Sequence, residues 1–307
     1  MQVQSRATIL VAGVSVLDFI FRLTALPRQA EKYRASDAIV SGGGGGANAA
    51  VAVVRLGGRA VLASRLGDDV VGRLILDDLE REGVDCGLTR QFPGRRSSFS
   101  SVFVTDAGDR QIVNYRDIDA QDSAEWIADN RYSAIDAVLA DTRWPRGALA
   151  AMELARQRGI AGILDAEAPV QEAAAALKLA SHVAFSAQGL ADLSGSSDIE
   201  AGLRKAAADL PAWVCVTDGE NGAYWLDGNR LHHAPAYRVD ALDTLAAGDT
   251  WHGAFALRLG EGATAPEAVR FAHAAAAIKC TRFGGRNGAP RRDEVEEFIA
   301  TRALKCE

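Results

Sequence analysis

Residues 243–249 read Asp243-Thr-Leu-Ala-Ala-Gly-Asp249, and the apolar stretch Thr250-Trp-His-Gly-Ala-Phe-Ala-Leu257 follows directly. The first stretch is a polar, glycine-containing turn, and the second predicts a helix that begins near Asp249. Backbone N–H groups at a helix start lack partners within the helix, and the helix dipole favours an anion there. The sequence therefore predicts a site for a phosphoryl group, with Asp249 accepting the proton of an attacking hydroxyl. The alternative is that Asp249 only caps the helix.

Five consecutive glycines, Gly42 to Gly46, precede Ala47 and Asn48. A backbone without side chains suits a polyol lying flat against it, with Asn48 hydrogen-bonding its hydroxyls. Two other interpretations stay open. The run fits the dinucleotide pattern G-x-G-x-x-A, with an acid about 20 residues later at Asp68 or Asp69. It is also compatible with a flexible loop.

The rest of the chain alternates between short apolar runs and helical stretches, above all after residue 130. We predict strands at residues 8–14, 60–64, 134–140, 160–165, 182–185 and 213–217, and helices at residues 47–56, 72–82, 146–158 and 172–179. This order predicts an α/β fold with a mostly parallel sheet covered by helices on both faces. We expect one domain over residues 1–307. Two excursions, at about 19–40 and 96–117, alternate in polarity and predict a small β-sheet lid.

Composition excludes several classes of protein. The net charge of −6 argues against a nucleic-acid-binding face, and no stretch approaches the length of a membrane span. The four cysteines, Cys86, Cys215, Cys280 and Cys306, have no CxxC spacing. Neither a disulfide framework nor a zinc site is expected, and a cytoplasmic location fits. Walker A, HExxH and nucleophile-elbow motifs are also missing from the sequence.

Two further segments are candidates for ligand contact. Asp18 follows the first predicted strand, where ligands of open α/β sheets bind, and its carboxylate suits two sugar hydroxyls. A surface turn is the alternative. The glycine-rich loop from Arg282 to Pro290 follows an alanine-rich helix. Its Gly284 and Gly285 line a nucleotide or monovalent-ion site, or the loop is only a turn.

Taken together, these motifs resemble the ribokinase-like carbohydrate kinases, the PfkB family, over nearly the whole chain. The resemblance rests on Asp18, the glycine run with Asn48, the hairpin near Asp106–Arg110, the segment from Val216 to Ala223 and the stretch 243–249. It implies a three-layer α/β sandwich with a β-sheet lid. It also implies ATP, Mg²⁺ and transfer of the γ-phosphoryl to an alcohol; a monovalent cation such as K⁺ is a further expectation.

The same resemblance implies roles for individual residues. Asp249 is the base, and Ala246, Ala247 and Gly248 complete the anion hole with it. The nucleotide lies along Thr217, Gly219 and Gly222, and the sugar binds Asp18, Gly43, Gly44 and Asn48.

Two departures from the family pattern stand out. Ala246 occupies a position that is usually glycine, and a left-handed backbone there would cost ~1–2 kcal/mol. The family's Asn-x-x-Glu motif, which organises metal and phosphates, is also missing. The matching stretch is Phe185-Ser-Ala-Gln-Gly-Leu190. We expect water and other residues to organise the metal, and these departures raise a binding-only regulator as an alternative.

Finer resemblance points to a substrate. The segments Ala140–Trp144 and Cys280–Gly288 are similar to those of 6-deoxy-6-sulfofructose kinases, which implies that Lys32, Asn114 and Arg143 hold the sulfonate. Two cations and a neutral donor suit a small anion. A phosphorylated ketose needs a similar pocket, whereas a neutral-sugar or nucleoside kinase needs none. Because exposed lid strands leave unpaired edges, we also expect a homodimer formed through the lid.

Overall fold

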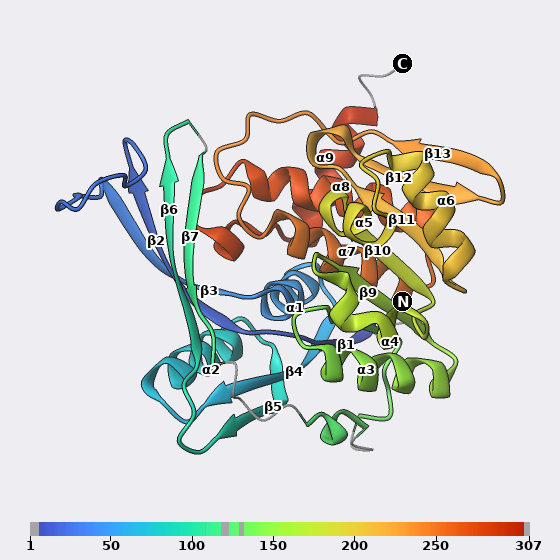
Figure 1. Cartoon of the computed structure of the whole chain (residues 1–307), viewed down its shortest axis with the longest axis horizontal. Coiled ribbons are helices and arrows are strands. Elements are labelled where there is room, and N and C mark those ends of the chain that lie inside the picture. The colour runs from blue at the N-terminus through green and yellow to red at the C-terminus, as the bar shows by residue number, and fades with distance from the viewer. Residues whose placement is uncertain (1–5, 108, 118–122, 129–131, 304–307) are drawn as a thin grey trace.

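The computed structural model describes residues 6–107, 109–117, 123–128 and 132–303. Two separate sheets organise them, and Figure 1 shows the smaller one standing to one side of the larger. Nine strands form the large sheet in the order β13-β12-β11-β10-β9-β8-β1-β4-β5. They are β1 (Thr8–Ala12), β4 (Arg59–Gly67), β5 (Asp85–Phe92), β8 (Ala137–Asp141), β9 (Ala161–Ala166), β10 (His182–Ser186), β11 (Trp213–Thr217), β12 (Ala223–Asp227) and β13 (Arg230–Ala234).

Every pairing from β5 through β11 is parallel, and only β12 and β13 are antiparallel additions at one edge. Helices cover both faces (Figure 1). They are α1 (Gly45–Arg55), α2 (Val70–Arg81), α3 (Pro145–Arg158), α4 (Ala174–Leu177), α5 (Ala187–Ser194), α6 (Ile199–Asp209), α7 (Ala247–Gly260), α8 (Ala265–Cys280) and α9 (Arg292–Ala303). Short 3₁₀ turns occupy Glu125–Ala128, Val170–Ala173, Gly219–Asn221 and Gly285–Gly288.

Alternation along β1 shows why the molecule has three layers. Ile9 and Val11 enter the core beneath α1, α7 and α8, whereas Leu10 and Ala12 enter the core beneath α3 and α6. A strand with both faces buried has to be apolar throughout. The predicted α/β sandwich with a mostly parallel sheet is therefore confirmed.

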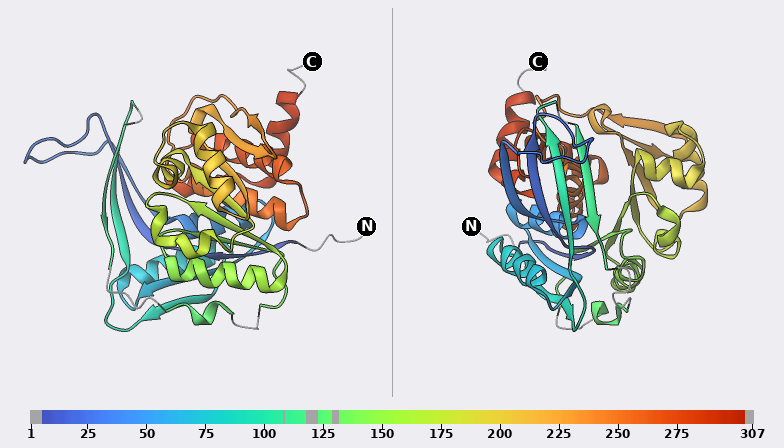
Figure 2. Two further views of the ribbon diagram at one scale, coloured as in Figure 1. Left: turned by 45° about the vertical axis from the view of Figure 1, so that its right-hand side comes forward. Right: turned by 60° about the vertical axis from the view of Figure 1, so that its left-hand side comes forward.

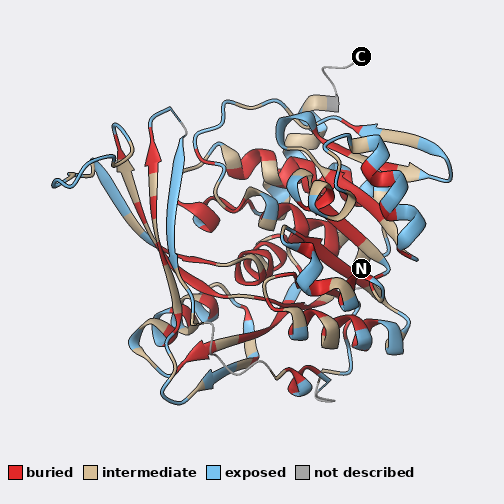
Figure 3. Cartoon of the chain, in the orientation of Figure 1, coloured by how far each residue is buried: buried red, intermediate tan, exposed pale blue. Residues whose placement is uncertain are grey.

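Four strands, β2 (Val16–Leu23), β3 (Asp37–Gly43), β6 (Ser98–Thr105) and β7 (Arg110–Tyr115), form the lid sheet in the order β3-β2-β6-β7. Figure 2 shows this sheet projecting past the body of the molecule, and Figure 3 shows exposed residues along its outer strands. It supplies one wall of the site described below.

Some predicted bounds were wrong. Asp18 lies within lid strand β2 and not in a turn after the first strand, because the chain turns at Gly13 and enters the lid at Val16. Helix α1 begins at Gly45, so the last two glycines of the run are helical. The helix predicted at 172–179 is a 3₁₀ turn followed by the single turn α4.

The glycine run begins in the last two residues of the lid strand β3 and does not follow the buried β1, which removes the dinucleotide-binding interpretation. Among the described residues no helix is long and apolar enough to cross a bilayer. Cys86, Cys215 and Cys280 have free thiols, and Cys306 lies outside the described residues.

Candidate active site

The turn at 243–246 leads into helix α7, and its last residue has a left-handed backbone conformation. Ala246 has φ 64°, and it is the only residue other than glycine with positive φ in the part of the chain that the structure describes. Ala247 N–H donates to the Thr244 carbonyl within the turn at 3.2 Å. The N–H groups of Gly248 and Asp249 lie in the first turn of α7, where no intrahelical acceptor exists. This helix start therefore has the geometry of an anion hole.

Asp249 is held against the glycine run. Its Oδ2 accepts a hydrogen bond of 2.7 Å from Asn48 Nδ2. A Cβ placed on Gly45 would lie 3.5 Å from Asp249 Oδ1, so the glycine backbone forms the floor beside the carboxylate. Burial raises the pKa of Asp249 to about 6, helped by nearby acids and opposed by the Asn48 hydrogen bond. A carboxyl with this pKa is a stronger base than a solvated one and is still ionised at neutral pH.

The lid brings Asp18 to the same floor. A Cβ on Gly43 would lie 2.0 Å from Asp18 Oδ2, so only glycine fits at that position. Burial raises the pKa of Asp18, while a hydrogen bond from Ser100 and the charge of Arg286 lower it. Asn114 on β7 donates to Ser100 Oγ at 3.0 Å, which continues the polar row across the lid.

Asp141, at the end of β8, joins three segments around the site. Its Oδ2 accepts from Val14 N–H at 2.8 Å and from Gly46 N–H at 3.0 Å, and its Oδ1 accepts from Arg143 N–H at 3.0 Å. Asp141 thus fixes the glycine run against the ends of β1 and β8. Asp141 was missed from the sequence, although a carboxylate at the end of a parallel strand is a recognisable pattern.

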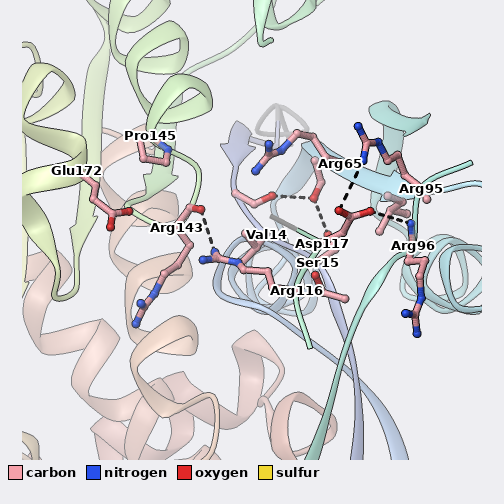
Figure 4. A pocket seen from close by; sticks show the side chains of 15 residues that line it. Val14, Ser15, Arg65, Arg95, Arg96, Arg116, Asp117, Arg143, Pro145 and Glu172 are labelled. Carbon is pink, nitrogen blue, oxygen red and sulfur yellow. Dashed lines mark hydrogen bonds and ion pairs between the residues drawn. The ribbon is translucent and has the colours of Figure 1, made fainter. Parts of the chain in front are cut away.

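Beside this floor lies a cavity of about 310 Å³ lined by arginines (Figure 4). The five arginines come from four separate segments of the chain: Arg65, the adjacent Arg95 and Arg96, Arg116, and Arg143. The acids in the lining are Asp117 and Glu172, so cations outnumber acids five to two. Ser98, two residues before Ser100 on β6, also lines the cavity and connects it to the polar row from Asp18 to Asn114.

Several of these arginines are held in place. Arg116 donates to the Arg143 carbonyl at 2.9 Å, as Figure 4 shows, and Arg143 pairs with Glu167 at 2.8 Å. The guanidinium of Arg96 stacks on Tyr115, and that of Arg65 on Trp144. Guanidinium groups held this way are preorganised for an anion.

Comparison with known proteins decides the family. The profile described as pfkB family carbohydrate kinase matches residues 6–292. This chain belongs to the pfkB family of carbohydrate kinases. It is therefore a phosphotransferase that acts on sugars.

Individual relatives agree with this kinase family. The chain is 28% identical to ribokinase of Bacillus subtilis over 298 residues, covering 95% of this chain and 99% of that one. It is 29% identical to fructokinase-1 of rice, Oryza sativa subsp. japonica, over 287 residues, covering 84% and 88%. A crystal structure from Agrobacterium tumefaciens, whose protein carries a provisional ribokinase name, superposes with a TM-score of 0.90 at 35% identity, covering 98% and 99%.

The residues expected to contact the nucleotide divide into two groups. Thr217 ends β11, and Gly219 and Gly222 follow with φ values of 52° and 94°, as a tight turn needs. Gly284 and Gly285 lie elsewhere, at the junction of the lid with the 243–249 turn. Their N–H groups donate to Asp243 Oδ2 at 3.1 and 2.9 Å.

The predicted sulfonate residues are only partly brought together. Arg143 lines the arginine cavity. Asn114 lies on lid strand β7, two residues before Arg116 of the cavity lining, and does not line the cavity itself. Lys32 is exposed in the loop between β2 and β3 and does not line the cavity. The arginines Arg65, Arg95, Arg96 and Arg116 were missed, because no spacing in the sequence unites them.

Proposed function

We propose that this kinase transfers the γ-phosphoryl of ATP to a hydroxyl of an anionic ketose, with 6-deoxy-6-sulfofructose as the substrate to test first. The observation that carries the proposal is the arginine cavity beside the Asp18 and Asp249 floor. A sugar whose reacting hydroxyl lies at Asp249 has its other end directed toward the cavity. A neutral pentose or hexose carries no anion that could pair with the five guanidinium groups of the cavity.

In the proposed reaction, Asp249 accepts the proton of the attacking hydroxyl while the hydroxyl oxygen attacks the phosphoryl group. Asn48 holds the carboxylate in position, and its Oδ1, buried without a partner, is available to accept a sugar hydroxyl. Within the 246–249 stretch, the N–H groups of Gly248 and Asp249 stabilise the charge that develops on the transferred group. Asp18, with Gly43 and Gly44, positions the sugar, and closure of the lid excludes water.

The nucleotide is proposed to lie along Thr217, Gly219 and Gly222, with its phosphates directed to the start of α7. Within the described ranges, no group of three or more His, Cys, Asp or Glu side chains is arranged as a metal site. We propose that a Mg²⁺ ion would be held mainly by ATP phosphates and water, with one or two carboxylates. When bound, it would neutralise phosphate charge.

The substrate's anion is proposed to bind Arg143 and Arg116, with Asn114 as a neutral donor. Arg143 already has an acidic partner, Glu167, which an incoming sulfonate or phosphate would displace or share. The charge excess of the cavity serves either anion, so a phosphorylated ketose is the nearest competitor.

A kinase for a neutral sugar is the second candidate, since the named relatives are ribokinases and a fructokinase. It requires Arg143→Ala to leave catalysis largely intact. A binding-only regulator is the third, favoured by the strained Ala246 and the missing Asn-x-x-Glu motif. Such a protein would bind ATP without turnover.

We also propose a homodimer formed through the lid. Val40 on β3 and Ile112 and Val113 on β7 are exposed large apolar residues of its outer strands. A second lid would cover them. A monomeric mass in light scattering at working concentration would remove this proposal.

We also propose that the protein works in the cytoplasm. ATP as the phosphoryl donor and the free thiols favour that compartment.

The experiment is ATP-to-ADP turnover with Mg²⁺ across 6-deoxy-6-sulfofructose, fructose 6-phosphate, tagatose 6-phosphate, fructose, ribose and adenosine. Asp249→Asn is the control. Fast turnover on one anionic ketose, abolished in the control, would support the proposal. Preference for fructose, ribose or adenosine would replace it with the second candidate, and ATP binding without turnover would support the third.

A further inference from the structure

A lysine is completely buried next to the anion-hole turn. Lys279, in the last turn of α8, is 0% exposed. Its Nζ donates to the Asp243 carbonyl at 2.6 Å and lies 3.2 Å from Asp243 Oδ2. A buried ammonium is tolerated only when paired and hydrogen-bonded. Both atoms that satisfy it belong to the first residue of the turn that forms the anion hole.

Asp243 connects this lysine to the surrounding segments. Its Oδ1 accepts from Leu245 N–H at 2.8 Å, inside the turn. Its Oδ2 accepts from Gly284 and Gly285 of the C-terminal loop. Its own N–H donates to the Cys280 carbonyl at 3.0 Å. The Lys279–Asp243 pair thus joins the anion-hole turn, helix α8 and the C-terminal loop.

A monovalent cation is expected at this junction, because the sequence marks the loop 282–290 as a candidate lining of a monovalent-ion site. A K⁺ ion needs carbonyl and carboxylate oxygens that have no other cation beside them. At this junction the Asp243 carbonyl and Oδ2 already face the Lys279 ammonium, and two N–H groups also point at Oδ2. A second cation placed there would be repelled by Lys279. The residues present do not fit a bound K⁺ at Asp243.

We propose that the Lys279 ammonium is a built-in substitute for a monovalent cation, so that this kinase holds its anion-hole turn without K⁺. Because Lys279 is completely buried and acts through Asp243, it is a positioning residue. Only the turnover part of its test rests on the proposed kinase reaction. The stability part does not.

The first test uses the unmodified protein. Its thermal midpoint, with and without ATP and Mg²⁺, is measured in KCl, NaCl and choline chloride at equal ionic strength, together with turnover on its best substrate. The expected result is the same midpoint and the same turnover in all three salts. A midpoint or turnover that rises specifically in K⁺ would overturn the proposal. If no sugar is phosphorylated, the proposed kinase reaction is wrong. The thermal midpoints in the three salts still test whether Lys279 replaces a monovalent cation.

The second test removes the ammonium. Lys279→Ala leaves space beside Asp243, whereas Lys279→Met fills that space without charge. Both variants should lose several degrees of thermal midpoint in choline chloride. K⁺, ammonium or methylammonium should restore part of the loss in Lys279→Ala only. Lys205→Ala, which removes an exposed lysine of α6, should behave as the unmodified protein does.

Lack of rescue in a folded Lys279→Ala protein, or equal rescue of Lys279→Met, would reduce Lys279 to an ordinary core residue and contradict the proposal. If Lys279→Ala does not fold in any salt, the thermal midpoints and turnover of the unmodified protein in the three salts are the remaining test of the proposal.

Discussion

The start of helix α7 and the arginine cavity are connected through Gly45 and Asp141 but are built in different ways. The first comes from one continuous stretch, 243–249, and one contact partner, Asn48. The second gathers five arginines from segments as far apart as residues 65 and 143. In our proposal, the first positions groups for transfer of a phosphoryl group, and the second recognises the anion of the substrate. We therefore expect changes in the first to act on kcat and changes in the second to act on substrate choice.

The largest effect should come from Asp249→Asn. This variant keeps the shape and loses the base, so kcat should fall by about 10³-fold. ATP affinity, measured by calorimetry, should stay close to that of the unmodified enzyme. Near-normal kcat would assign Asp249 to capping only and would break the proposed division of roles.

The pH profile should report the same carboxylate. Because burial raises the pKa of Asp249 to about 6, kcat/KM should be flat above this pH. Below it, kcat/KM should fall by about tenfold per pH unit as the base becomes protonated. Since the Asn48 hydrogen bond lowers the pKa, Asn48→Ala should move this limb to higher pH. A limb that does not move in Asn48→Ala would separate Asn48 from the base.

Asp249→Asn should stabilise the folded protein although it lowers kcat. The pKa of Asp249 is raised on folding, so its charged form opposes folding above about pH 6, and this penalty disappears toward pH 4. The Asp249 side chain is only half-buried, so solvent screens part of this penalty. Asp249→Asn should therefore raise the free energy of unfolding by about 1–3 kcal/mol at pH 8. Urea unfolding at pH 8 and pH 4.5 would check this, and an equal gain at both pH values would contradict it.

A smaller effect is expected at Ala246. Its φ of 64° is unfavourable for a residue with a Cβ. Ala246→Gly should stabilise the native turn, and the net gain should be about 1 kcal/mol or less, since glycine also loosens the unfolded chain. Ala247→Gly, one residue on, is the matched control and should destabilise. A loss of stability in Ala246→Gly would show that the turn has relaxed around alanine.

The same contrast explains what the sequence could predict. The layered fold, the strand bounds to within a few residues and the stretch 243–249 follow from local periodicity and contiguous motifs. Asp18 was singled out from the sequence as a sugar ligand but was placed in a turn, because nothing local shows that the chain enters a lid at Val16. Arg65, Arg95 and Arg116 meet only through tertiary packing, so no local pattern marks them. Lys279 was not singled out from the sequence, because it is one of several polar residues in an alanine-rich helix, and only the structure shows its partner, Asp243.

The central claim is that the arginine cavity selects an anionic ketose, and one ratio tests it most directly. This is kcat/KM for 6-deoxy-6-sulfofructose divided by kcat/KM for fructose, measured in the unmodified enzyme, in Arg143→Met and in the surface control Arg204→Met. We predict a ratio well above one that falls by about 10- to 100-fold in Arg143→Met, as expected when a charge-assisted hydrogen bond is lost, and is unchanged in Arg204→Met. A ratio below one in the unmodified enzyme, or the same ratio in all three proteins, would contradict the account.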